Sequence, residues 1–181
     1  DTKGRLTGGA HGFGAKLTNI FSTNFTAETA DTKRKLLYKQ TWTDNMRERG
    51  EPDIIALPDN VTNDYTKVSF TPDFPRFGMK SSSEFWKLKG DDTLALMVRR
   101  VWDVAGVNSE LNITIDGTSL DINSFLEYVG MFGEPIDNEL EKKEVIKPLY
   151  LRPNRHWELV VGSSTDAKFQ QVSFVNSIST L

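Results

Sequence analysis

The feature that most constrains this chain is a cluster of glycines close to its first residue. Four glycines fall within seven residues, and a segment with helical apolar periodicity follows them: Gly8, Gly9, Gly12 and Gly14. Glycine adopts positive φ without a side-chain clash and lets backbone amides approach a ligand closely. A helix that begins at such a loop adds unpaired amide donors and the positive end of its dipole. This pattern is typical of a phosphate-binding loop, and equally of a mobile loop before a core helix.

Two common nucleotide-binding motifs do not fit the cluster. Gly9 and Gly14 have the spacing of a Walker loop, but an extra residue precedes Lys16, and Leu17 has no hydroxyl group for magnesium. Gly12 and Gly14 match the start of the dinucleotide fingerprint, but Leu17 stands where its third glycine belongs. The residues before the cluster are also too polar for a buried parallel strand. The loop therefore points to a nucleotide site of another kind.

The composition is that of a folded domain and excludes several function classes. Hydrophobic residues make up 38% of the 181 positions, cysteine is absent, and the net charge is −3. No disulfide framework or thiolate metal site is therefore possible, and no apolar run is long enough to span a membrane. A negative charge argues against a main DNA-binding surface. The short basic clusters are interpreted as solvated faces or helix ends: Lys33-Arg34-Lys35, Arg99-Arg100 and Lys142-Lys143.

Periodicity predicts a helix followed by antiparallel strands in the first half of the chain. Residues 13–22 have an apolar helical stripe formed by Phe13, Leu17, Ile20 and Phe21. Residues 25–29 and 34–43 alternate as strands around a short turn and are predicted to form a hairpin. Residues 44–64 are polar and rich in turn residues, so they are expected to be mostly loop. Residues 65–71 predict another strand.

The second half is predicted to begin with a long helix. Asp91 or Asp92 is expected to cap it, Gly106 to end it, and its apolar stripe to comprise Leu94, Met97, Val98, Val101, Trp102 and Ala105. A strand that turns at Asp116-Gly117 follows, and then a helix capped by Asp121.

The last part of the chain is predicted to hold a linker and three strands. Residues 133–147 combine Gly, Pro and alternating charges and are expected to be a surface linker. Strands are expected near 148–152, 156–162 and 170–176. The four tyrosines are interpreted as strand or core aromatics without acid–base neighbours: Tyr38, Tyr65, Tyr128 and Tyr150.

Beyond these patterns, the glycine cluster resembles a loop of one known family. Gly8-Gly9-Ala10-His11-Gly12-Phe13-Gly14-Ala15-Lys16-Leu17 is similar to the Gly-Gly-Arg-Asn/His-Gly-Tyr/Phe-Gly-Ala-Lys-Leu loop of eukaryotic type II DNA topoisomerases. Further stretches resemble that family in the same order along the chain. Among them are Lys39-Gln40-Thr41-Trp42, Asp44-Asn45-Met46, Pro72-Asp73, Arg76-Phe77-Gly78-Met79-Lys80, Val98-Arg99-Arg100-Val101 and Phe169 to Ile178. The resemblance thus covers almost the whole chain.

The resemblance implies an α+β fold. It implies the later half of a GHKL (Bergerat-type) ATPase sandwich of mixed sheet and helices, followed by the first strands of a transducer domain. Residues 1–144 would belong to the ATPase domain, with the glycine loop as its ATP lid, and residues 145–181 to the transducer.

The resemblance also implies that the loop binds ATP. Backbone amides and one ammonium group would hold the β- and γ-phosphates, on Gly9, His11, Gly12, Phe13, Gly14 and Lys16. Ala10 departs from the family, which usually has arginine there, so five donors and a fixed positive charge are lost. Either the role of that arginine is peripheral, or nucleotide handling is altered in this chain.

The hydrolytic residues of the family have no counterpart here. Its Glu-x-x-x-Asn helix, in which the glutamate activates water and the asparagine holds magnesium, is matched only in letters by Glu134 to Asn138, where Pro135 disfavours a helix. No catalytic residue and no metal ligand is therefore assigned, and the Mg²⁺ ligand and the DNA-cleaving tyrosine are expected outside this chain. We expect a fragment that does not turn over ATP alone.

In the parent protein, ATP would close an N-terminal dimer clamp that drives strand passage. The implied partners are ATP, duplex DNA through other regions and a second copy of the parent, with no membrane, and the implied location is the nucleus. Two alternatives remain open. One is another GHKL-type ATPase, such as a chaperone or mismatch-repair protein, which the run from Phe169 to Ile178 argues against. The other is a non-catalytic dimerisation module, which Ala10 and the missing motifs favour.

Overall fold

The computed structural model describes residues 8, 9, 11–80, 90–132, 148–164 and 168–180. The fold is α+β, as the resemblance implied. The chain divides into two compact units, which are described separately: one is Gly9–Asp91, and the other joins Asp1–Gly8 to Asp92–Leu181. The predicted linker and the predicted boundary between 144 and 145 lie outside the described residues, so that boundary stays a prediction.

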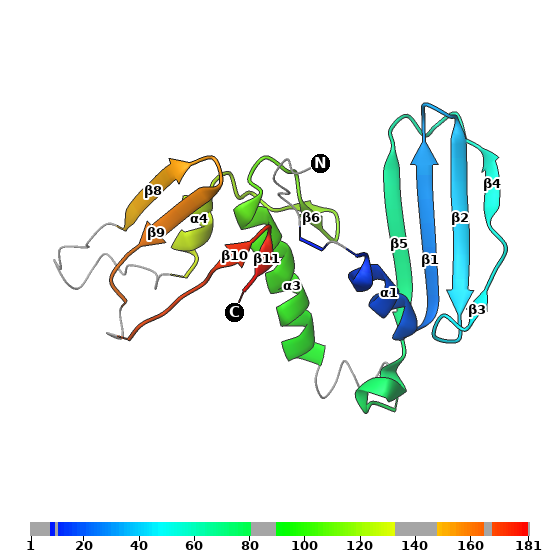
Figure 1. Cartoon of the computed structure of the whole chain (residues 1–181), viewed down its shortest axis with the longest axis horizontal. Helices are drawn as coiled ribbons and strands as arrows, with labels where there is room; N and C mark the ends of the chain where they lie inside the picture. The colour runs from blue at the N-terminus through cyan, green and yellow to red at the C-terminus, as the bar shows by residue number, and fades with distance from the viewer. Residues whose placement is uncertain (1–7, 10, 81–89, 133–147, 165–167, 181) are drawn as a thin grey trace. The chain divides into compact units, whose positions relative to one another are not determined.

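In its described residues, the first unit is an antiparallel sheet with the helix α1 Phe13–Ile20 beside it (Figure 1) and the 3-10 helix η1 Phe74–Phe77 after its last strand. Its strands are β1 Ser22–Asp31, β2 Leu36–Thr43, β3 Glu48–Arg49, β4 Asp53–Ala56 and β5 Tyr65–Pro72. β1 is central, with β2 on one side and β5 on the other, while β3 and β4 both pair with β2. The predicted hairpin and the strand from residue 65 are confirmed.

Residues 44–64 are mostly loop, as predicted, but the short strands β3 and β4 interrupt them. The sequence pattern did not predict β4. It is four residues long, too short to show an alternating pattern, and prolines flank it at Pro52 and Pro58. Cross-strand pairing decides its structure, because Ile54 and Ile55 pair with Tyr38 and Leu37 of β2. Such pairing is a tertiary effect that local propensity does not reveal.

The two faces of the sheet differ in polarity. Phe25 is buried on one face, and its neighbours across the strands are Trp42 and Phe70. The rings of Phe25 and Trp42 meet edge to face, with centroids 6.0 Å apart, an arrangement that aromatic pairs favour. The opposite face is polar, with Thr26 and Thr41 hydrogen-bonded at 2.9 Å. Alternation of side chains along each strand thus places the aromatic cluster on one side only.

In the part that the structure describes, the second unit contains two helices and three short hairpins. Its elements are α3 Gly90–Val107, β6 Thr114–Ile115, β7 Thr118–Ser119, α4 Phe125–Gly130, β8 Leu149–Asn154, β9 Trp157–Val161, β10 Phe174–Val175 and β11 Ile178–Ser179. The core comprises Ala105 of α3, Tyr128 of α4, and Ile122, which precedes α4. No helix in the described ranges combines the length and the apolar character that crossing a membrane requires.

The predicted ends of α3 are wrong. The helix already begins at Gly90, so Asp91 and Asp92 fall in its first turn instead of capping it. It also continues through Gly106 to Val107. Gly106 is buried, and an added Cβ there would overlap the ring of Tyr128 and lie 2.7 Å from the Tyr128 Cβ atom. This glycine therefore serves close helix packing instead of helix termination.

The start of α4 also differs from the prediction. Ser124 is the N-cap instead of Asp121, and its Oγ atom accepts a hydrogen bond from the Glu127 amide at 3.2 Å. The Glu127 carboxylate in turn accepts from the Asn123 amide at 2.8 Å. The residues Ser124 and Glu127 thus form a variant of the capping box. The Ser-x-x-Glu spacing is a sequence signal that favours Ser124 over Asp121 as the cap.

The predicted strand over 170–176 is only partly correct. β10 and β11 are two residues each and form a tight hairpin through Asn176 and Ser177, both with positive φ. The predicted turn at Asp116-Gly117 is confirmed, and both of its residues also have positive φ. Turns with two positive φ values match the twist of hairpin strands.

The buried carboxylate of Asp103 joins α3 to α4. The Tyr128 hydroxyl donates to Asp103 Oδ1 at 2.7 Å, and Arg100 Nη1 lies 2.8 Å from Asp103 Oδ2. Asp103 is 4% exposed. Because these two contacts reach different oxygens, each oxygen of the buried carboxylate has a partner within the protein. Burial, together with the hydrogen bond to the Asp103 carboxylate, raises the pKa of Tyr128 far above its usual value.

We predict that Gly106→Ala destabilises the chain. Alanine normally stabilises a helix interior by roughly 0.5–1 kcal/mol relative to glycine. Here the methyl group would overlap the Tyr128 ring, and overpacking of this kind costs about 1–3 kcal/mol. Gly130→Ala is the matched control, because a Cβ there meets nothing within 4 Å. Urea unfolding of both variants measures the effect, and equal unfolding free energies would contradict the packing argument.

We predict that stability falls at alkaline pH through Tyr128. The unfolded chain loses this proton near the ordinary tyrosine pKa of 10.0, while the folded chain retains it. Stability is therefore complete below about pH 10 and declines above it, by up to about 1.4 kcal/mol per pH unit. Tyr128→Phe should cost about 1–2 kcal/mol near neutral pH, for the lost hydrogen bond. That cost should shrink as the pH rises through 11; a constant cost from pH 8 to 11.5 would refute the assignment.

Candidate functional site

The glycine cluster forms a loop with left-handed backbone geometry before α1. Gly9 has φ 81° and Gly12 has φ 67°, and both are exposed. Residues with a Cβ rarely adopt such values, and the cost is about 1–2 kcal/mol for each. Since a Cβ at either glycine would meet nothing within 4 Å, backbone conformation alone explains glycine at these two positions.

The helix α1 comprises Phe13–Ile20 and begins without a side-chain cap. Its N-cap is Gly12, and the only bond back to Gly12 O in the first turn comes from the Lys16 amide, at 3.3 Å. The amides of Phe13, Gly14 and Ala15 therefore have no acceptor inside the helix. The first turn also contains no acidic residue that would offset the positive end of the helix dipole. This end of α1 can accept an anion.

The predicted site residues all lie at this end of the chain's first helix. Gly12, Phe13, Gly14 and Lys16 form the N-cap and first turn, and all are exposed. His11 precedes them, and its ring centroid is 5.7 Å from that of Phe13. Ala10 lies outside the described residues. The structure brings the assigned amides and the lysine to one helix end; their binding of phosphate stays a prediction.

The apolar stripe of α1 is not buried as predicted. Phe13 and Leu17 are 64% and 52% exposed, respectively. The helix lies against β1 and β5, and Asn19 is buried at 4% exposure. Asn19 Oδ1 meets no hydrogen-bond donor among the described residues. The helix therefore leaves its apolar stripe open beside the glycine loop.

The opposite end of α1 is fastened to the sheet. Ser22 Oγ donates to Thr18 O at 2.6 Å, and the Asp73 amide donates to Phe21 O at 2.8 Å. Arg76 Nη1 donates to Ile20 O at 3.2 Å, which satisfies a carbonyl at the end of the helix. A cation at this position also complements the negative end of the helix dipole.

A second set of contacts fixes Ser22, Asp73 and Arg76, the residues that hold the carboxyl end of α1. The Asn45 amide donates to Ser22 O at 3.1 Å, and Asn45 Nδ2 donates to Asp73 Oδ2 at 2.9 Å. Asp73 pairs with Arg76 at 3.5 Å, and the Arg76 guanidinium lies 5.4 Å from the centre of the Phe21 ring. The carboxyl end of α1 is thus held by the Ser22 and Arg76 side chains and the Asp73 backbone amide, and Asn45 fixes Ser22 and Asp73. The amino end remains free to face a ligand.

Sequence reasoning assigned no role to Asn45, Asp73 and Arg76. All three stand in stretches that carried the family resemblance, Asp44-Asn45-Met46, Pro72-Asp73 and Arg76 to Lys80. Their place in these stretches is the sequence signal that could have identified them as functionally relevant. Asp44, Asn45 and Met46 each have positive φ, between 49° and 68°. Such strain in residues other than glycine persists only where surrounding contacts enforce it, and the contacts of Asn45 supply them.

The clearest hollow in the first unit lies away from α1. It has a volume of about 400 Å³ and is lined by Thr29, Ala30, Asp31, Asp64, Tyr65 and Thr66, where β1 ends. Asp64 accepts hydrogen bonds from the amide and hydroxyl of Thr32, which lower its pKa, and Asp31 pairs with Arg34. These carboxylates are already satisfied by the chain itself. The hollow is open and polar, and nothing in it matches the predicted phosphate site.

Three tyrosines have carboxylate neighbours that the sequence did not predict. Tyr65 donates to Glu28 at 2.7 Å, Tyr150 to Glu158 at 2.5 Å, and Tyr128 to Asp103. The hydrogen bonds to Glu28 and Glu158 raise the pKa values of Tyr65 and Tyr150. A tyrosine with a raised pKa stays protonated, so these pairs act as structural bonds. The tyrosines remain strand or core aromatics, as predicted.

The described residues do not form a metal centre. No three His, Asp or Glu side chains within the described ranges lie close enough together to hold a metal ion. The letter match from Glu134 to Asn138 lies outside those ranges.

Comparison with known proteins connects the chain to one family. A probable DNA topoisomerase 2 of Dictyostelium discoideum is 44% identical over 181 residues, which is 100% of this chain and 11% of that protein. The human DNA topoisomerase 2-alpha is 41% identical over 180 residues, 99% of this chain and 11% of that protein. No protein-family model matches the chain. The chain therefore spans about a tenth of the length of these curated relatives.

Solved structures show the same relation. The ATPase region of Saccharomyces cerevisiae topoisomerase II superimposes with a TM-score of 0.77 at 40% identity, covering 97% of this chain and 42% of that one. The ATPase and transducer domains of DNA topoisomerase II from Balamuthia mandrillaris give a TM-score of 0.79 at 40% identity, covering 97% and 40%. The resemblance to the ATPase region of eukaryotic type II DNA topoisomerases is confirmed in both sequence and fold.

Proposed function

We propose that this chain works within an ATP-dependent type II DNA topoisomerase, where it supplies the loop that binds the phosphates of ATP. The observation that carries the proposal is the amino end of α1. Its cap is a left-handed glycine without a side chain, and its first turn has no acidic residue. The similarity to ATPase regions of topoisomerases II supports the phosphate tail of ATP as the anion.

The first-turn amides and Lys16 have complementary roles in this proposal. The amides of Phe13, Gly14 and Ala15 donate hydrogen bonds in fixed directions, since the helix orients them. Lys16 adds a mobile positive charge that offsets repulsion among the phosphate oxygens. Gly9 and Gly12 let the backbone turn toward the ligand, and His11 contributes a further backbone amide. No residue of the described part is proposed to be catalytic.

The remaining functions are proposed for the parent protein as a whole. ATP binding would close a clamp between two copies of the parent, and duplex DNA would be bound and cleaved by other regions. Nuclear action is proposed by analogy with the family, although one similar Dictyostelium protein is named as mitochondrial. Magnesium would be held by the asparagine of the family's Glu-x-x-x-Asn helix, which has no counterpart in this sequence.

We predict that Gly12→Ala weakens binding of a non-hydrolysable ATP analogue to the 181-residue chain. The substitution strains the cap by about 1–2 kcal/mol, which corresponds to a loss of roughly 5- to 30-fold in affinity if the first-turn amides move. Isothermal titration calorimetry measures the dissociation constant. Lys16→Ala should likewise weaken binding by about tenfold or more, because a charge-assisted contact is removed.

Two matched variants separate a binding role from general damage. Gly117→Ala places alanine at φ 78° in the β6–β7 turn, so it has the same backbone cost without contact with the loop. Lys33→Ala removes the same charge from the β1–β2 turn. Both should bind the analogue as the unaltered chain does. If they weaken binding equally, or if the unaltered chain binds no analogue, the proposal fails and a non-catalytic module is favoured.

A further inference from the structure

The turn between β2 and β3 has an unusual backbone. Asp44, Asn45 and Met46 are consecutive, and their φ values are 49°, 57° and 68°. A residue with a side chain rarely adopts this left-handed region, although asparagine and aspartate tolerate it better than others. No glycine stands at these three positions to relieve the backbone. Surrounding contacts must therefore hold the turn, and they point to its role.

Asn45 makes such contacts, and they converge on two groups that hold α1. Its backbone amide donates to Ser22 O at 3.1 Å, and its Nδ2 atom donates to Asp73 Oδ2 at 2.9 Å. In turn, Ser22 Oγ donates to Thr18 O of the helix at 2.6 Å. The Asp73 amide donates to Phe21 O, at the helix end, at 2.8 Å. Asn45 thus bridges the two segments that are bonded to the carboxyl end of α1.

The bridge ends on a charged group that is largely buried. The Asp73 side chain is 14% exposed and also pairs with Arg76, whose Nε atom lies 3.5 Å from Asp73 Oδ2. Arg76 Nη1 in turn donates to Ile20 O at 3.2 Å. A hydrogen bond to a charged acceptor is about twice as strong as one between neutral groups, and partial burial strengthens it further. Asn45 therefore orients Asp73 and, through it, the guanidinium that meets the helix end.

We propose that Asn45 is a positioning residue for the amides in the first turn of α1. The helix has eight residues, so it is about 12 Å long, and a tilt of about 10° at its carboxyl end moves its first turn by about 2 Å. Hydrogen bonds to a phosphate oxygen need donor–acceptor distances of about 2.7–3.2 Å, so such a displacement breaks them. This inference rests on the proposed function and adds to the same site a residue at the opposite end of the helix.

A double-mutant cycle between Asn45 and Asp73 in the 181-residue chain tests the proposal. Asn45→Asp keeps a residue that tolerates positive φ but places a carboxylate against Asp73. It should weaken binding of the non-hydrolysable ATP analogue by about tenfold, which is 1.4 kcal/mol. Asp73→Asn should weaken binding several-fold, because the pair with Arg76 loses a charge. The double variant keeps the net charge and re-forms the hydrogen bond with donor and acceptor exchanged, so it should bind better than Asn45→Asp alone. Additive losses in the double variant would overturn the proposal.

Spectra recorded without nucleotide test the positioning directly. In ¹H–¹⁵N NMR spectra, Asn45→Asp should shift the amide resonances from Phe13 to Lys16, and the double variant should restore them. A purely local role of Asn45 would leave these resonances unchanged, because they belong to the opposite end of α1. Unchanged first-turn resonances in Asn45→Asp would therefore overturn the proposal.

Two further variants separate this role from general damage. Asn176→Asp makes the same substitution at φ 50° in the β10–β11 turn, where the residue is exposed, and it should alter neither the affinity nor the α1 resonances. Asn45→Gly removes the side-chain bridge but eases the backbone, so it should still weaken binding if Asn45→Asp does not fold. Thermal unfolding shows whether each variant is folded at the assay temperature.

The unaltered chain distinguishes failure of this inference from failure of the proposed function. If it binds the analogue tightly and the folded Asn45 variants bind equally well, the inference fails while the proposed function stands. If it binds no analogue, the proposed function fails, and the inference with it.

Discussion

The amino end of α1 carries amide donors that the helix itself cannot satisfy, and the first unit is organised around that constraint. The opposite end is fixed by Ser22, Asp73 and Arg76, which meet the last helical carbonyls or the strand that follows. A helix held at one end keeps the direction of its dipole and of its first amides. The energetic cost of unpaired donors is small while they face water, and their pairing with an anion becomes favourable.

Fixing the carboxyl end of α1 is also the role of the polar contacts between the sheet and the segment after β5. Asn45 is held in a left-handed conformation, with φ 57°, and joins the β2–β3 turn to the start of β1 and to Asp73. Arg76 then reaches the helix end from the segment after β5. These residues do not contact the proposed phosphate site. They determine where that site is presented, which is why single substitutions among them are expected to act at a distance from their own contacts.

Much of the fold could be predicted from residue patterns, and the failures share a cause. The β1–β2 hairpin, β5 and the helix after the glycine loop follow from periodicity and turn residues. The short strand β4 did not, because cross-strand pairing of Ile54 and Ile55 with β2 decides its structure. Gly106 seemed to end a helix, but its lack of a side chain is needed for the Tyr128 ring. Ser124 replaced Asp121 as a cap because Glu127 completes its box.

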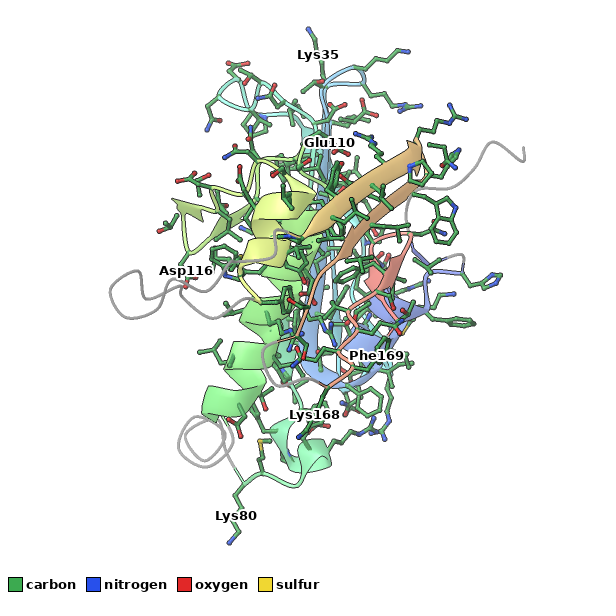
Figure 2. All side chains as sticks on the ribbon, turned by 90° about the vertical axis from the view of Figure 1, so that its left-hand side faces the viewer. Lys35, Lys80, Glu110, Asp116, Lys168 and Phe169 are labelled. Carbon is green, nitrogen blue, oxygen red and sulfur yellow. The ribbon has the colours of Figure 1, made fainter. Side chains whose placement is uncertain are left out.

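For the site, the loop was predictable and its supports were not. Gly12 and Lys16 could be assigned from the family resemblance, whereas the contacts by which Asn45 and Arg76 support the helix emerge only in three dimensions. Several large side chains also remain exposed, such as Phe169 at 89% (Figure 2). The sequence around a residue does not reveal how exposed its side chain is, because the residues that would bury it are distant in the chain.

The most direct test of the account follows the backbone amides themselves. An ¹H–¹⁵N NMR titration of the 181-residue chain with the non-hydrolysable ATP analogue should give its largest shifts at the amides from Phe13 to Lys16. The competing anion site is the exposed basic turn from Lys33 to Lys35, whose last side chain extends from the tip of the β1–β2 hairpin (Figure 2). Largest shifts in that turn, with the first turn of α1 unchanged, would contradict the assignment of the phosphate site.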